Sequence, residues 1–203
     1  MILQGNGMIA DQFEGFNVLT QEECELMIRE GKKNMQNSTI FRSDEQKTIE
    51  SLTRSSKTGF FTNSSSFEVK KILDKLASVF KEIVFYNYRF PLCSVESPQF
   101  INYIENDYFT WHIDSAPRLK SEEQFIDRDF SMSVILSCNS EYEGGLEFVT
   151  PHPHNIIEVK KIEEEQGQVI IFPSNTIHRV SPVRGERSSL VCWASHNYGG
   201  KNL

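Results

Sequence analysis

The sequence lacks the features that mark secreted, membrane-spanning and disulfide-rich proteins. Its 203 residues include only four cysteines, widely separated and without a C-x-x-C pair, so we expect reduced and buried thiols. No apolar run approaches the roughly 18 residues that suggest a membrane span. The first residues contain neither the basic segment nor the apolar core of a signal peptide. We therefore expect a cytoplasmic protein with no membrane partner.

Positive charge is also scarce. Lysine and arginine number 21 against 28 aspartates and glutamates, which gives a net charge of −7. Sequence-independent binding to nucleic acid needs a basic surface, so we expect no nucleic-acid partner. What the sequence does contain is an ordinary share of hydrophobic residues, 38%, and enough length for one domain with a sizeable core.

The N-terminal region, residues 1–90, is predicted to be a helical support for the rest of the fold. Residues Thr20–Glu23 form a capping box before a helical pattern that Gly31 can end. A second box, Ser65–Glu68, opens a longer helix that we expect to pack on a sheet. Its apolar residues form one stripe: Val69, Ile72, Leu73, Leu76, Val79, Phe80 and Ile83. The polar stretch 34–64 shows no clear period and predicts irregular surface structure.

After Pro91 the chain changes to short β-like runs separated by turn residues. The expected strands are 98–104, 108–114, 130–138, 145–150, 155–160, 168–173, 176–181 and 187–195. Eight short strands with few helices between them predict a mainly β protein with a jelly-roll core over residues 91–199. Gly144-Gly145 and Pro173–Asn175 are the predicted turns.

One short motif within these strands indicates a metal site. His112 and Asp114 are two residues apart in an expected strand, so their side chains share one face. An imidazole beside a carboxylate can hold one edge of a metal ion. A second histidine would complete a 2-His-1-carboxylate site, which suits Fe(II) with open coordination positions. H-x-D is too short to be specific, so this interpretation depends on the rest of the chain.

His178 is the best candidate for the third ligand. It follows the apolar strand Val169–Pro173 and a turn, and it should begin the returning strand of a hairpin. His152 and His154 are flanked by prolines and suggest an exposed loop, which holds metal geometry less well than a rigid strand. His196 is expected to be a structural or surface residue.

Arg187 opens the last expected strand and shares a face with Ser189. An arginine that points into a barrel is costly unless it meets an anion. Its planar fork suits a carboxylate, and a serine hydroxyl can add one hydrogen bond. A dicarboxylate such as 2-oxoglutarate fits, with one end chelating iron and the other on Arg187. The alternative is a surface arginine on a strand, and Arg184 in the preceding turn is a weaker candidate.

These residues together resemble a known family. From about Gln99 to Trp193 the chain resembles the Fe(II)/2-oxoglutarate-dependent dioxygenases of the prolyl 4-hydroxylase-like group, and within it the PKHD-type hydroxylases. The resemblance is carried by Tyr103, His112-x-Asp114, Arg128-Asp129-Phe130-Ser131, Tyr142-Glu143-Gly144-Gly145 and the run from Phe172 to Arg187.

The resemblance implies a double-stranded β-helix core with helices packed outside it. It also implies that iron is bound by His112, Asp114 and His178, and that Arg187 binds the distal carboxylate of 2-oxoglutarate. Tyr103 matches a tyrosine that often helps to bind the cosubstrate; the alternative is a packed barrel aromatic.

The reaction implied is hydroxylation of an unactivated C–H bond with 2-oxoglutarate and O2, releasing succinate and CO2. Ascorbate is a candidate reductant for the iron. The substrate implied is a prolyl or other amino-acid residue of a peptide, or a small molecule. Related halogenases replace the carboxylate at Asp114 with a small residue, so its presence favours hydroxylation. Two alternatives are a zinc hydrolase that uses the same triad and a module that only binds its ligand.

The chain departs from the family pattern at two places. Asn106 stands where the family often has glycine, and asparagine tolerates the left-handed backbone that such a turn needs. Leu146-Glu147 replaces the usual Glu-Leu after the two glycines. The polar link 115–129 directly follows the metal motif and is either a substrate loop or a solvated connection.

Overall fold

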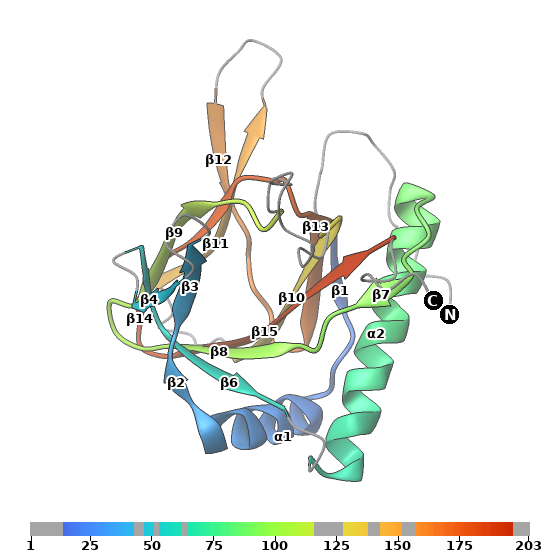
Figure 1. Ribbon diagram of the computed structural model, residues 1–203, viewed down its shortest axis with the longest axis horizontal. Coiled ribbons are helices and arrows are strands. Elements are labelled where there is room, and N and C mark those ends of the chain that lie inside the picture. Colours follow the sequence, from blue (N-terminus) through green and yellow to red (C-terminus); the bar gives the residue numbers. More distant parts are fainter. Residues whose placement is uncertain are drawn as a thin grey trace.

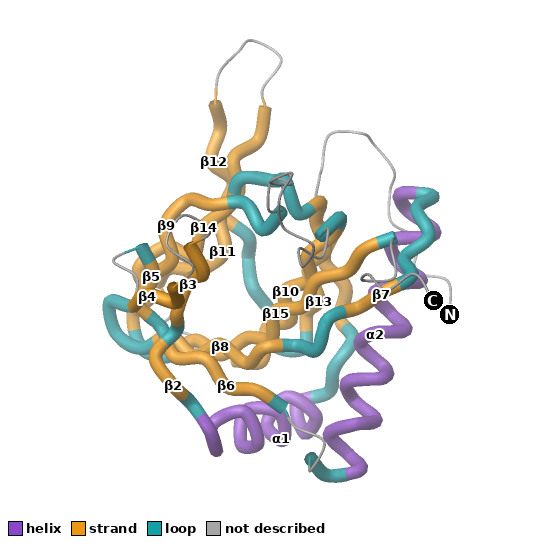
Figure 2. Tube along the Cα trace, in the orientation of Figure 1, coloured by secondary structure: helices purple, strands orange, loops and turns teal. Residues whose placement is uncertain are grey.

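The computed structural model describes residues 14–42, 47–50, 53–61, 65–115, 128–137, 143–151 and 157–196. Within this part of the chain, antiparallel strands form two main sheets, and two helices lie outside the larger one (Figures 1 and 2). The mainly β fold with supporting helices that the sequence predicts is confirmed.

The helices and strands follow one another in a nearly all-β order. In the chain they are β1 (Glu14–Asn17), α1 (Gln21–Gly31), the short 3-10 helix η1 (Lys32–Asn34), β2 (Gln36–Asn37), β3 (Thr39–Arg42), β4 (Lys47–Glu50), β5 (Arg54–Ser55), β6 (Lys57–Phe60), α2 (Phe67–Tyr88), β7 (Ser94–Val95), β8 (Gln99–Tyr103), β9 (Tyr108–His112), β10 (Phe130–Ser137), β11 (Glu143–Pro151), β12 (Ile157–Lys161), β13 (Gln168–Pro173), β14 (His178–Arg184) and β15 (Arg187–Ser195).

Both helices begin at hydroxyl caps. Thr20 and Glu23 form the predicted capping box of α1, with side chain and backbone bonded in both directions. The second helix begins one residue later than predicted, because the Ser66 hydroxyl rather than that of Ser65 accepts the hydrogen bond from the Val69 backbone.

The larger sheet has the order β1-β13-β10-β15-β8-β6-β2, with β7 paired to β15, and the smaller sheet has the order β12-β11-β14-β9-β5. The pair β3-β4 stands apart from both. Since β1, β2 and β6 come from residues 1–90, the prediction of a helical N-terminal support was wrong in leaving out these strands. That region completes the larger sheet as well as covering it.

The predicted irregular structure at 34–64 was also wrong, because five short strands, β2 to β6, lie there. Among the side chains that the structure describes in this region, the buried ones are hydroxyls rather than apolar groups. Ser38 Oγ lies 2.8 Å from Ser56 Oγ and 2.6 Å from Thr58 Oγ1, and all three residues are buried. Hydroxyls that satisfy one another can fill the inside of a strand pair, so the sequence shows no apolar alternation there.

The last strand, β15, has two buried faces. Its even-numbered residues Leu190, Cys192 and Ala194 belong to the hydrophobic core between the larger sheet and the helices. Its odd-numbered residues from Arg187 to Trp193 line a cavity between the two sheets. The period of two in a strand therefore separates the residues that face the helices from those that face the cavity.

Gly144-Gly145 do not form the predicted turn. They lie inside β11 with φ angles of 104° and 118°, where the register against β14 shifts between Glu143 and Gly145. A Cβ atom on Gly144 would lie 2.4 Å from the carbonyl oxygen of Pro182. This is a bulge that only glycine fits. Asn106 has the expected left-handed backbone, with a φ of 66°.

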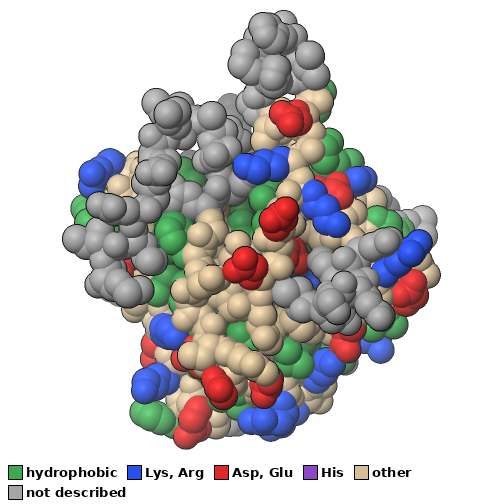
Figure 3. Space-filling model, turned by 180° about the vertical axis from the view of Figure 1, so that it is seen from behind, with side chains coloured by type: hydrophobic (Ala, Val, Ile, Leu, Met, Phe, Trp, Pro, Cys, Tyr) green, Lys and Arg blue, Asp and Glu red, His purple; other side chains and the backbone are tan. Residues whose placement is uncertain are grey.

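Cys24, Cys93 and Cys192 form no disulfide, and Cys24 and Cys192 are buried as predicted, whereas Cys93 is only half-buried; Cys138 lies outside the described residues. Within the described part, no helix is long and apolar enough to cross a membrane. On the face seen in Figure 3, basic and acidic side chains are interspersed.

Candidate metal and cosubstrate site

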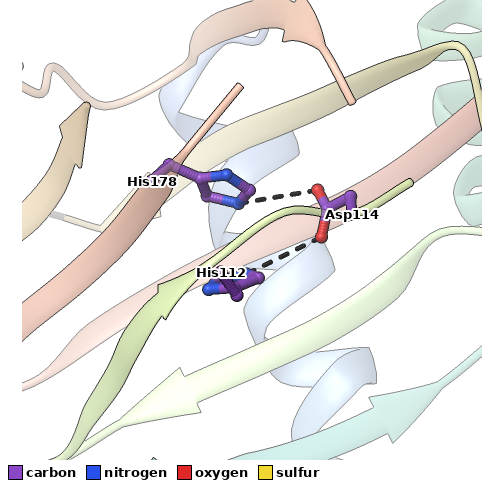
Figure 4. A group of neighbouring side chains, drawn as sticks. All are labelled: His112, Asp114 and His178. Carbon is purple, nitrogen blue, oxygen red and sulfur yellow. Dashed lines mark ion pairs between the residues drawn. The ribbon is translucent and has the colours of Figure 1, made fainter. Parts of the chain in front are cut away.

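His112 and His178 come from neighbouring strands of the smaller sheet and are direct cross-strand partners. Their rings lie 4.2 Å apart. Asp114 follows β9 and turns its carboxylate toward both rings (Figure 4). Asp114 Oδ1 lies 3.7 Å from His112 Nε2, and Oδ2 lies 3.5 Å from His178 Nε2. The three candidate ligand atoms all lie within 4.8 Å of one another, so the structure brings the predicted triad together.

Each imidazole is oriented by its own strand. His112 Nδ1 lies 2.7 Å from the carbonyl oxygen of Thr110, and His178 Nδ1 lies 2.9 Å from that of Thr176. A carbonyl oxygen only accepts, so Nδ1 carries the hydrogen in both rings and Nε2 keeps its lone pair. Both lone pairs are thus available at the point that Asp114 also faces.

The carboxylate of Asp114 is held by a short chain of hydroxyls. Ser131 Oγ donates to Oδ2 at 2.7 Å and lies 2.8 Å from Ser174 Oγ. The backbone N–H of Asp114 donates to the carbonyl oxygen of Ser174 at 2.8 Å. These bonds fix both the strand end and the carboxylate, as metal ligands require.

The electrostatics favour the metal-binding protonation states. Burial, followed by the nearby His178, lowers the pKa of His112 to about 4. Burial alone would raise the pKa of Asp114, but the two imidazoles and the Ser131 hydrogen bond lower it below its usual value. At neutral pH the site therefore holds a neutral His112 and an ionised Asp114. Two imidazole nitrogens and one carboxylate fit a divalent ion such as Fe(II).

A cavity that is open to solvent extends from the triad between the two sheets, and the empty space in it, open solvent included, is about 500 Å³. The predicted cosubstrate residues Arg187, Ser189 and Tyr103 all line it. Arg187 Nη1 donates to Ser189 Oγ at 2.9 Å, and its Cζ lies 5.6 Å from the centre of the Tyr103 ring. The structure thus brings the three together on one wall of the cavity.

Glu164 is a functional-site neighbour that the sequence analysis missed. Its carboxylate accepts from Arg187 Nε at 2.9 Å and from Nη2 at 2.8 Å. The exposed fraction of the side chain is 1% for Arg187 and 0% for Glu164. One glutamate in a run of three looks like a solvated loop residue in the sequence, which is why no pattern singles it out.

Three further residues, Phe109, Arg54 and Trp193, line the cavity near the triad. Phe109 stacks on the His112 ring with centroids 3.6 Å apart, and the Arg54 guanidinium lies 4.9 Å from the centre of the Phe109 ring. The Trp193 Nε1 atom is buried and has no hydrogen bond of ordinary geometry within the described residues, although Trp193 also helps to lower the pKa of the Asp114 carboxyl.

Of the other three histidines, only His196 lies among the described residues, and it does not line the cavity. It is exposed, and its Nδ1 lies 2.7 Å from Asp129 Oδ2, which fits the predicted structural or surface role. His152 and His154 lie outside the described residues, as does most of the link 115–129. Arg184 is exposed at the end of β14 and does not line the cavity.

Comparison with known proteins agrees with this geometry. Residues 98–195 match the family model of the 2OG-Fe(II) oxygenase superfamily, and that segment contains all three triad residues and Arg187. Residues 98–195, just under half of the 203-residue chain, are thus similar to the 2OG-Fe(II) oxygenase superfamily. The matched segment runs from just before β8 to the end of β15, and so covers every strand that contributes to the triad.

Curated relatives include PKHD-type hydroxylases from bacteria. One from Alteromonas mediterranea is 33% identical over 98 residues, which are 47% of this chain and 42% of the relative. One from Shewanella oneidensis is 35% identical over 97 residues, 47% of this chain and 41% of that protein. The match thus spans less than half the length of these oxygenase relatives.

Solved structures extend the likeness of fold to nearly the whole chain. A Pseudomonas putida prolyl-4-hydroxylase has a TM-score of 0.67 at 14% identity and covers 92% of this chain and 94% of its own. A prolyl hydroxylase from Trichoplax adhaerens was solved with a peptide fragment of hypoxia inducible factor. It has a TM-score of 0.70 at 16% identity, and the match covers 90% of this chain and 83% of that protein. The predicted jelly-roll oxygenase fold is thereby confirmed.

Proposed function

We propose that this protein is an Fe(II)- and 2-oxoglutarate-dependent dioxygenase that hydroxylates an unactivated C–H bond and releases succinate and CO2. The observation that carries the proposal is the arrangement of one cavity. Two imidazole Nε2 atoms and a carboxylate converge at one point of it, and the buried Arg187 lines its wall. A zinc hydrolase could use the triad but has no need of such an arginine.

The residues of this chain divide the binding work. His112, Asp114 and His178 would hold the iron, and Arg187, Ser189 and Tyr103 would hold the distal carboxylate of 2-oxoglutarate. When bound, iron and 2-oxoglutarate supply the oxidising chemistry with O2. The protein fixes the ligands, orients the cosubstrate and positions the substrate C–H bond.

The cavity walls favour exclusion of water. Leu146, Phe172 and Val180 line the cavity, and all three are buried. A dry wall limits side reactions and strengthens the interaction between Arg187 and a carboxylate.

We propose a peptidyl proline or another amino-acid residue as the substrate, with a small molecule as the alternative. Support comes from the fold shared with prolyl hydroxylases, one of which was solved with a peptide. The Phe109 ring and the Arg54 guanidinium in the wall offer a substrate an apolar contact and a positive charge.

The test is succinate formation from 2-oxoglutarate with Fe(II) and ascorbate, first without substrate and then with a panel of peptides and free amino acids. We expect slow uncoupled turnover that a true substrate accelerates. The His112→Ala variant should fold and form no succinate. A zinc-loaded protein that hydrolyses a substrate, with no response to 2-oxoglutarate, would replace this proposal with the hydrolase.

A further inference from the structure

We propose that Glu164 is a positioning residue that aims Arg187 at the cosubstrate and sets its selectivity for 2-oxo acids that end in a carboxylate. The inference rests on the proposed function, in which Arg187 binds that carboxylate. It assigns a role to a buried acidic side chain that neither the triad nor the cosubstrate contacts explain.

The Arg187 guanidinium is held on two sides. Glu164 accepts from Nε and Nη2, which lie on one edge of the planar group. Ser189 accepts from Nη1 at 2.9 Å. A planar fork bonded along one edge and at a further nitrogen cannot rotate about its axis without breaking a charge-assisted bond. Its orientation in the cavity wall is therefore set before any ligand arrives.

Glu164 holds the arginine from outside the cavity. Arg187 and Ser189 line the cavity, whereas Glu164 is not among the described residues that do. Its side chain is nevertheless fully buried. Glu164 thus acts on a bound ligand through Arg187 and does not occupy the ligand's place.

The position of Glu164 is itself fixed by the backbone around it. The Leu146 N–H donates to Glu164 Oε1 at 3.0 Å. Further along the same segment, the Gly167 N–H donates to the Ile135 carbonyl at 2.8 Å, and the Gln166 side chain donates to the Leu136 carbonyl at 2.9 Å. The segment between β12 and β13 is thereby tied to β10 of the larger sheet and to β11 of the smaller one.

The Arg187–Glu164 pair changes how the distal carboxylate of the cosubstrate is recognised. Arg187 and Glu164 together carry no net charge, so the long-range electrostatic attraction between this pair and a ligand carboxylate is weak. The binding free energy then depends mainly on hydrogen bonds from guanidinium N–H groups that are already oriented toward the carboxylate. Selectivity should then depend on the orientation that Glu164 imposes. Partners that orient metal-ligating side chains typically change metal affinity or activity by about 10–100-fold when they are mutated, and we expect an effect of similar size for the partner of Arg187.

The experiment compares two ligands on Mn(II)-loaded protein by isothermal titration calorimetry. One is 2-oxoglutarate, and the other is 2-oxopentanoate, which has the same chain length but no distal carboxylate. For Glu164→Gln we expect the Kd of 2-oxoglutarate to rise about tenfold or more while that of 2-oxopentanoate stays the same. Glu163→Gln, which alters an exposed neighbour in the same segment, should change neither.

The outcomes separate this inference from the proposed function. If the wild-type protein does not prefer 2-oxoglutarate to 2-oxopentanoate, the proposed role of Arg187 fails. If the wild type has that preference and Glu164→Gln keeps it, the role of Glu164 fails. Loss of both ligands together would show a merely structural residue. Should Glu164→Gln not fold, Glu164→Asp withdraws the carboxylate by one methylene and must still weaken 2-oxoglutarate selectively.

Discussion

His112 and His178 face each other as a cross-strand pair of β9 and β14, with their rings 4.2 Å apart and both Nδ1 atoms bonded to backbone carbonyls. An ion shared by the pair and Asp114 links two strands that are distant in sequence. Metal binding should therefore stabilise the smaller sheet, because the unfolded chain has no such site.

Metal should raise the thermal stability of the protein. At a free Mn(II) concentration a hundredfold above its Kd, linkage gives about 2.7 kcal/mol, or roughly 5–10 °C in Tm for a chain of this size. Thermal melts with and without metal measure it. The shift should vanish in His178→Ala and persist in His196→Ala, which alters a histidine outside the site.

Without metal, the stability should fall in mild acid. The pKa of His112 is about 4 in the folded protein against an ordinary 6.5, so between these values the unfolded chain binds more protons. The stabilisation is present above pH 6.5 and is lost as the pH falls to about 4, by on the order of 3 kcal/mol. Urea unfolding of the metal-free protein at several pH values measures this. A His112→Gln variant should show a flatter dependence over the same range.

Removing Arg187 should have two separable effects. Arg187→Ala takes away the carboxylate anchor, which should cost about 3–5 kcal/mol in cosubstrate binding by analogy with broken buried pairs. The half-saturation constant for 2-oxoglutarate should then rise by roughly two to four decades. The substitution also leaves Glu164 buried without its cation, which should lower the unfolding free energy.

A second substitution distinguishes these effects. In an Arg187→Ala background, Glu164→Gln should recover part of the lost unfolding free energy, since no buried charge remains, while 2-oxoglutarate binding stays weak. Denaturant unfolding and calorimetric titration measure the two quantities on the same four proteins. Half-saturation as in the wild type for Arg187→Ala would refute the assignment of that arginine.

The thiols should differ in reactivity. Burial raises the pKa of Cys192 to about 12, and the side chain is fully buried, so it carries almost no thiolate at neutral pH. Cys93 is half-buried. Iodoacetamide labelling followed by mass spectrometry should find Cys93 modified well before Cys192 in the native protein. Equal labelling of the two would show that β15 opens readily.

The candidate site was largely predictable because its residues are paired at a spacing of two. Arg187 and Ser189 both lie in β15, and a strand places such residues on one face. His112 ends β9 and Asp114 lies two residues beyond the strand, yet its carboxylate still turns toward both imidazole rings. The predicted ranges 168–173 and 187–195 coincide with β13 and β15. Both strands have apolar residues on both faces, and this pattern identified them as buried strands in the sequence.

The parts that were missed depend on contacts that a local pattern does not contain. The N-terminal strands bury Ser38, Ser56 and Thr58, whose hydroxyls satisfy one another only once the strands are paired. Glu164 is buried because Arg187 lies opposite, far along the chain. The Gly144-Gly145 pair looks like a turn until the approach of Pro182 is known.

The strict alternation along β15 has an evolutionary consequence. One set of positions lines the cavity, and the other packs in the core beneath the helices. Mutations at Ser189 or Val191 should then change ligand preference with less effect on the scaffold than mutations at the even positions. Divergence within such a lineage should accumulate on one side of this strand while the opposite side drifts only among similar apolar residues.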